Sequence, residues 1–262
     1  MSEDEIFVFL IAGAVAISSI GMTSVNGLHA LCLERNPGPG LVRLGIVGGI
    51  AWLGIVLAFF GDPSIQGIYV WFYLVLGYAV IKLFGQVLGG MYGVSMRVDV
   101  AERRNWAAAL FLAAFTFGTG LIFGGSLWGE ADPYSEYEGG WWIPMGFFLL
   151  GWTLMSIMIA IYLLREPGRF RTIVLQERDI GAASGAASFT LGTAVFMTDA
   201  VSGDFFGWGA GLMDVSLAGG MLIAHEFLRT PTGLPEAAGT RRVVECAFYI
   251  ALALISTLLW TT

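Results

Sequence analysis

Apolar residues dominate eight stretches of the chain, and each stretch is about as long as a helix that crosses a bilayer. A transmembrane helix needs about 20 consecutive, mostly apolar residues. Short polar or glycine- and proline-rich connections separate the stretches, which span about 6–29, 41–61, 67–95, 106–128, 141–164, 180–202, 206–228 and 243–261. The pattern predicts an all-α polytopic membrane protein with eight transmembrane helices, organised as a single integral membrane domain over residues 1–262.

The overall composition agrees with this pattern. Of the 262 residues, 56% are hydrophobic and only 13% are charged, and the mean hydropathy is +0.76. The run at 6–29 lacks a basic segment before it and a small-residue cleavage site after it. We therefore expect a mature membrane helix there rather than a signal peptide.

The charged residues predict how the helices are oriented. Every arginine lies in an odd-numbered connection between predicted helices: Arg35, Arg43, Arg97, Arg103, Arg104, Arg165, Arg169, Arg171, Arg178, Arg229, Arg241 and Arg242. The opposite side carries acidic residues and no basic ones. By the positive-inside rule, the arginine-rich connections are cytoplasmic and both termini are outside. The net charge of −7 and the acidic outer face argue against a nucleic-acid partner.

Two of the predicted helices are copies of each other. Residues 113–119 align with residues 187–193 at an offset of 74, and the same offset places Asn105 on Asp179. Two helices return the chain to the side from which it started, so successive pairs are parallel repeats. The sequence therefore predicts four two-helix units, at about 6–61, 67–128, 141–202 and 206–262.

The starts of these two helices also carry a family resemblance. Residues 105–109 and 179–183 match an Asn-x-Ala-Ala pattern, and the segment from Ser202 through Asp214 is similar to the turn and helix that follow it. In these features the chain resembles the YjfL-like bacterial inner-membrane proteins, a four-helix family of unknown function. The resemblance implies two such units in tandem, a location in the bacterial cytoplasmic membrane and no established activity.

Three ionisable side chains lie inside the predicted spans: Lys82, Asp199 and Asp214. Charged groups at such depth are costly and are functional candidates by default. Tyr78, Lys82 and Gln86 follow one helix face at i, i+4 and i+8. One hypothesis is an ion or proton site at Asp214 and Asp199 with Lys82 as the countercharge. The alternative is a structural ion pair between Lys82 and Asp214.

The two histidines suggest a different chemistry. His29 and His225 are both expected at the inner ends of helices, where a facing pair could hold a haem and Arg229 could meet a propionate. The alternative is that neighbouring polar residues, Asn26 and Glu226, satisfy each histidine at the membrane interface.

No hydrolase, metalloprotease or phosphate-loop motif occurs, so catalysis is not predicted, and the pattern names no metal ligand or required cofactor. Small-residue faces such as 85–89 and 181–185 favour close helix packing and homo-oligomers in the lipid bilayer. The expected function is a structural or partner-binding membrane component in envelope organisation or stress. The alternatives are a small ion or proton channel or transporter and, more remotely, a bis-histidine haem electron-transfer subunit.

Overall fold

The computed structural model describes residues 1–21, 28–29, 32, 35–62, 65–129, 140–166, 170–203, 208–228 and 235–259, and these residues are almost entirely helical. Each predicted apolar run overlaps an α-helix: α1 (Glu3–Ser19), α3 (Gly38–Phe59), α4 (Ile68–Val80), α5 (Trp106–Gly125), α6 (Trp142–Arg165), α7 (Ile180–Ala200), α8 (Trp208–Leu228) and α9 (Pro235–Leu259). Helix α4 continues through a π-helical segment, η2 (Ile81–Val87), and a 3-10 turn, η3 (Leu88–Tyr92). The predicted all-α class is confirmed for the described part of the chain.

Among the described residues, six helical stretches are long and apolar enough to cross a membrane: Gly38–Phe59, Ile68–Tyr92, Trp106–Gly125, Trp142–Arg165, Ile180–Ala200 and Gly211–Leu228. They correspond to the second through seventh predicted runs. The chain therefore has the make-up of an integral membrane protein. A crossing by α1 and α9, which cover the first and last runs, stays a prediction.

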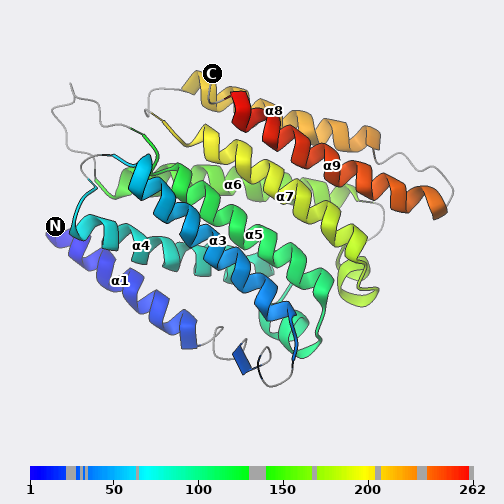
Figure 1. Ribbon diagram of the computed structural model, residues 1–262, viewed down its shortest axis with the longest axis horizontal. Helices are drawn as coiled ribbons and strands as arrows, with labels where there is room; N and C mark the ends of the chain where they lie inside the picture. Colours follow the sequence, from blue (N-terminus) through cyan, green and yellow to red (C-terminus); the bar gives the residue numbers. More distant parts are fainter. Residues whose placement is uncertain are drawn as a thin grey trace.

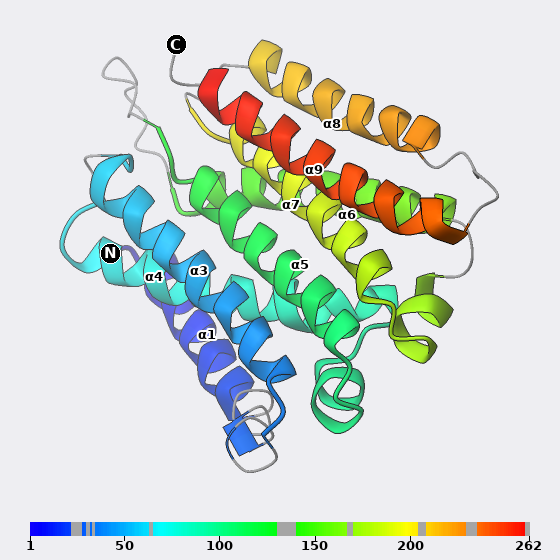
Figure 2. The same cartoon turned by 45° about the vertical axis from the view of Figure 1, so that its right-hand side comes forward.

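The helices form two layers that run in opposite directions (Figures 1 and 2). Helices α3, α5, α7 and α9 lie side by side as one parallel row, with each helix packed on the next. Helices α1, α4, α6 and α8 run the other way. Of these, α4 and α6 contact α5, whereas α6 and α8 contact α7. The core therefore lies on α5 and α7, which are largely buried along their lengths.

Glycine allows the helices of the row to approach closely. A methyl group on Gly120 of α5 would lie 2.6 Å from the Cα atom of Gly49 in α3. A methyl group on Gly125 of α5 would lie 2.6 Å from the carbonyl oxygen of Thr198 in α7. Small residues at helix interfaces let backbones meet in this way in membrane proteins. Gly49, Gly120 and Gly125 thus lie at the interfaces of the row.

Three helices of the row begin after the same unusual backbone conformation. Arg35, Arg104 and Arg178 have positive φ angles of 51°, 53° and 56°, a left-handed region that non-glycine residues seldom occupy. The next residue is Asn36, Asn105 or Asp179. The side chain of Asn105 accepts a hydrogen bond from the backbone of the third residue onward, Ala108, and Asp179 accepts one from Ala182 in the same way, so both cap their helices.

The same side chains link each helix of the row to the next. The Asn36 amide donates to the carbonyls of Val100 and Ala101 in the π-helical segment η4 (Met96–Glu102), which precedes α5. The Asn105 amide donates to the carbonyl of Val174 in segment η5 (Thr172–Gln176), which precedes α7. At the start of α7, Asp179 instead pairs with Arg242 of α9. The residue at each helix start therefore bonds either to the segment that precedes the next helix of the row or to that helix itself.

The opposite ends of the row are also joined. The backbone N–H of Gly129 donates to the carbonyl of Phe60 at 3.2 Å, and that of Gly203 donates to the carbonyl of Trp128 at 2.9 Å. The rings of Phe60 and Trp128 stack with their centroids 4.0 Å apart. Successive connections on this side thus contact each other as regularly as those on the arginine-rich side.

Candidate metal centre

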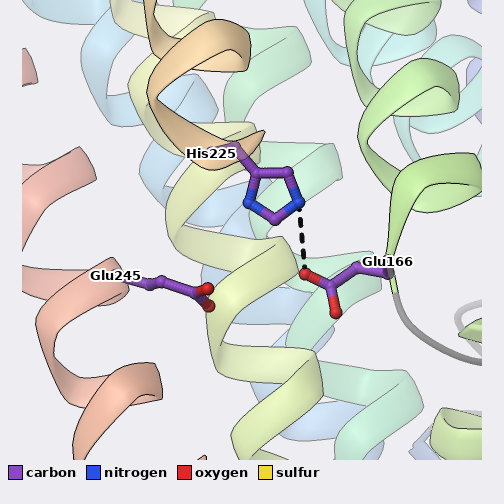
Figure 3. A group of neighbouring side chains, drawn as sticks. All are labelled: Glu166, His225 and Glu245. Carbon is purple, nitrogen blue, oxygen red and sulfur yellow. Dashed lines mark ion pairs between the residues drawn. The ribbon is translucent and has the colours of Figure 1, made fainter. Parts of the chain in front are cut away.

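Three side chains from different helices converge between α6, α8 and α9 (Figure 3). They are Glu166, which directly follows α6, His225 in the last turn of α8, and Glu245 in α9. One oxygen or nitrogen atom from each lies within 4.8 Å of the others. The His225 Nε2 atom is 3.4 Å from Oε1 of Glu166. His225 and Glu245 are almost fully buried, whereas Glu166 keeps partial contact with solvent.

Aromatic residues hold the imidazole in place. The Nδ1 atom of His225 lies 2.8 Å from the hydroxyl oxygen of Tyr249, so this hydrogen bond fixes the plane of the ring. The ring of Tyr162 lies against His225 with a centroid separation of 4.4 Å, and Phe189 stacks on Tyr162 at the same separation. The Tyr162 hydroxyl is hydrogen-bonded to Glu166. The histidine therefore presents Nε2 toward Glu166.

Helix α7 forms one wall of the cluster through its glycine face. A methyl group on Gly185 would lie 3.1 Å from the Tyr162 hydroxyl and 3.6 Å from Oε2 of Glu245. One turn earlier, a methyl group on Gly181 would lie 2.7 Å from the Arg242 guanidinium. The 181–185 small-residue motif, which the sequence assigned to helix packing, thus makes room for polar and charged side chains of α6 and α9.

A second pair of charges borders the cluster. The Asp179 carboxylate binds the Arg242 guanidinium, and this hydrogen bond lowers the pKa of Asp179 below its ordinary range. The same bond raises the pKa of Arg242, to which the negative charges of Glu166 and Glu245 also contribute. Arg242 therefore remains a fixed positive charge beside the two carboxylates.

One imidazole nitrogen and two carboxylates are a ligand set that divalent transition metals bind. Zn²⁺ takes histidine nitrogen and Asp or Glu oxygen at about 2.0–2.2 Å, commonly with three protein ligands and one open position. Ligand atoms around such an ion lie roughly 3.3–3.6 Å apart, so the separation of up to 4.8 Å here requires only small side-chain movements. The hydrogen bond from Nδ1 to Tyr249 supplies the outer contact that metal-bound histidines usually make.

Glu226 has a different role from the one the sequence suggested. We expected it to satisfy its neighbour His225 at the interface. Instead its carboxylate accepts two hydrogen bonds from Arg165 of α6, at 2.5 and 3.0 Å. His225 itself contacts Tyr249 and Glu166.

The structure does not bring the two histidines together. His29 is exposed and follows α1, which packs on α4 and η2. His225 is buried on α8, which packs on α6, α7 and α9. Arg229 and Asn26 lie outside the described residues. The bis-histidine haem hypothesis therefore finds no facing pair of ligands.

Lys82 lies in the other half of the molecule. Its side chain is fully buried on η2, and its ammonium group donates to the Gln86 carbonyl oxygen one turn further on. Tyr78, the third member of the predicted polar stripe, is partly buried. Segment η2 packs mainly on α5, whereas Asp214 belongs to α8 at the far side of the row (Figures 1 and 2). The structure does not bring Lys82 and Asp214 together.

The two intramembrane aspartates do meet. Asp214 is 2% exposed, and its carboxyl is hydrogen-bonded to the side chain of Asp199 near the end of α7. Two carboxyl groups can share such a bond only when one of them carries a proton, because ionised carboxylates are acceptors only. The sequence placed these two residues in one candidate ion or proton site, and that site stays a prediction.

Sequence reasoning missed Glu166 and did not connect Glu245 with His225. A usable signal existed, because all three residues fall at helix ends on the arginine-rich side and hence at similar predicted depth. Depth alone does not specify which helices are neighbours, and the row arrangement that places α9 beside α7 was needed to complete the cluster.

Comparisons with known proteins give no further guidance: no family model, curated protein or solved structure matches this chain.

Proposed function

We propose that this protein is an integral membrane protein that binds a divalent transition metal ion through Glu166, His225 and Glu245. The observation that carries the proposal is the convergence of these three ligands from separate helices, with two of them buried. Burying a carboxylate away from solvent is expensive unless it is paired or coordinates a metal.

The membrane arrangement that accompanies this proposal has eight spans in four parallel two-helix units, as in a tandem YjfL-like protein. Shared helix starts at Asn36, Asn105 and Asp179 support the repeat, and the parallel row supports its direction. Both termini then face outward in the bacterial inner membrane, and the arginine-rich ends face the cytoplasm. In this orientation the metal cluster opens toward the cytoplasmic interface.

Metal titration of the purified full-length protein in detergent tests the proposal. We expect Zn²⁺ or Co²⁺ to bind at one ion per chain, and Glu245→Gln and His225→Gln to weaken binding by at least tenfold. Glu226→Gln is the matched control, because Glu226 adjoins His225 in sequence but pairs with Arg165. Binding that is absent in the wild type, or unchanged in Glu245→Gln, would refute metal binding at this cluster.

A second candidate function, ion or proton transport, is favoured by the contact between Asp199 and Asp214. A carboxyl pair that shares one proton in a membrane helix can exchange it for another proton or a cation. Proteoliposome flux should fall in Asp214→Asn and remain in Lys82→Met if the aspartates alone form the site. Flux that survives Asp214→Asn would eliminate this candidate.

A further inference from the structure

Arg242 is positioned to act on the candidate metal cluster without joining it. It lies on α9 three residues before Glu245, so both side chains leave the same face of the helix and point toward α7. The Gly181 surface receives the guanidinium and the Gly185 surface receives the Glu245 carboxylate. The positive charge of Arg242 also interacts with Glu166 across the cluster.

A metal ion and Arg242 therefore compete for the same negative charge. Two cations near the same carboxylates repel each other, and this repulsion is strong where water is scarce. Asp179 offsets it, because its carboxylate binds the guanidinium directly from the start of α7. The pair leaves Glu166 and Glu245 with a net negative charge for a divalent ion to neutralise.

Building on the proposed metal site, we infer that Arg242 and Asp179 set its affinity for a divalent cation. Arg242 lowers the affinity by its charge, and Asp179 raises it by holding and neutralising Arg242. The two residues do not ligate the ion. They determine how much of the carboxylate charge is available to it.

The chain itself supplies a conservative replacement for Asp179. Asn105 occupies the corresponding place at the start of α5 and caps its helix through the backbone of Ala108. Asp179 caps α7 through Ala182 with the same geometry. Asp179→Asn therefore removes the charge and the ion pair while keeping a side chain that is known to cap in this backbone.

The test is a Zn²⁺ titration against a competing chelating dye, using the full chain in detergent. We expect Arg242→Gln to tighten Zn²⁺ binding about tenfold and Asp179→Asn to weaken it about tenfold. The double variant should bind more tightly than Asp179→Asn, because the guanidinium that Asp179 neutralises is no longer present. Arg97→Gln is the charge-matched control, since Arg97 is exposed and pairs with Glu102 away from the cluster.

The two single variants should change the Zn²⁺ affinity in opposite directions, and this distinguishes an electrostatic role of Arg242 and Asp179 from a structural one. If the Asp179–Arg242 pair only held α7 to α9, both single variants would weaken binding, and that result would overturn the inference. An unchanged affinity in Arg242→Gln would do the same. A wild type that binds no metal refutes the proposed function instead, and thermal melting of the metal-free variants shows whether each has folded.

Discussion

The starts of α5 and α7 have the same backbone conformation but different charge. Both follow an arginine with positive φ, and both are capped by the side chain that comes next. At α5 that side chain is Asn105, which is fully buried and donates to the carbonyl of Val174. At α7 it is Asp179, which accepts from Arg242. One structural position is thus neutral in the first case and ionic in the second.

The difference continues into the next helix of the row. Three residues after the start position, α5 and α7 carry Ala108 and Ala182. Helix α9 differs, because it begins at Pro235 and carries Arg242 and Glu245 further along the helix. The amino-terminal half therefore closes this end of the row with amide-to-carbonyl links. In the carboxy-terminal half, the same end of the row places charged side chains beside His225. Within the described residues, the His and Glu cluster lies in the carboxy-terminal half.

Exchanging the two start residues should give the largest effect. Asn105→Asp replaces an amide donor with a buried carboxylate that faces carbonyl oxygens, so we expect a loss of about 2–4 kcal/mol in unfolding free energy. Asp179→Asn should cost less than about 1 kcal/mol, since its pair is partly exposed. Unfolding in a detergent–denaturant titration measures both. Equal unfolding free energies for Asn105→Asp and the wild type would show that the start of α5 accepts a negative charge as readily as the start of α7.

The glycine contacts should also differ between the halves. Gly120→Ala would push a methyl group against the backbone of Gly49, with no flexible atom to move, so we expect a cost of about 1–3 kcal/mol. Gly192→Ala meets the flexible Met221 side chain and the Tyr249 carbonyl at 3.2 Å, so it should cost less. Gly54→Ala, with no described atom within 4 Å, is the neutral control in the same unfolding titration.

Tyr249 provides a test of how the histidine of the metal cluster is held in place. Tyr249→Phe removes the group that holds His225 Nδ1, and we expect Zn²⁺ affinity to fall about tenfold with little change in stoichiometry. Tyr73→Phe, a buried tyrosine of the amino-terminal half, is the matched control. A Tyr249→Phe protein that binds Zn²⁺ as tightly as the wild type would show that the hydrogen bond does not position the imidazole.

The smallest expected effect is a pH dependence of the Asp179–Arg242 pair. Because the pair lowers the folded-state pKa of Asp179 below 3.8, its contribution to stability is complete above that value. It is lost as the pH falls below 3.8 and through the folded-state pKa. The difference in melting temperature between wild type and Asp179→Asn should therefore shrink only in strongly acidic buffer. A difference that already vanishes near neutral pH would contradict this assignment.

Much of the fold could be predicted from the sequence, because membrane helices are recognised by the length and hydropathy of their apolar runs. The capping by Asn105 and Asp179 was also predictable, since these residues precede a run of small helix formers. The resemblance between residues 113–119 and 187–193 predicted a repeat, which stays a prediction; α5 and α7, which carry these segments, both lie centrally in the row. These features depend on local pattern alone.

The candidate site was less predictable because it depends on which helices are neighbours. The sequence paired Lys82 with Asp214 by charge, but η2 and α8 pack against different helices. It paired His29 with His225 by depth, and the row separates them as well. Glu166 belongs to no recognisable sequence motif. It became a candidate ligand only because the fold places residues of α8 and α9 beside the end of α6.

X-ray absorption at the zinc edge of the Zn²⁺-loaded protein tests the central claim most directly. If Zn²⁺ binds at Glu166, His225 and Glu245, the spectrum will show one imidazole nitrogen and carboxylate oxygens around the ion. The imidazole scattering will be lost in His225→Gln. A spectrum without imidazole, one dominated by sulfur from the free cysteines Cys32 or Cys246, or one unchanged in His225→Gln would contradict it.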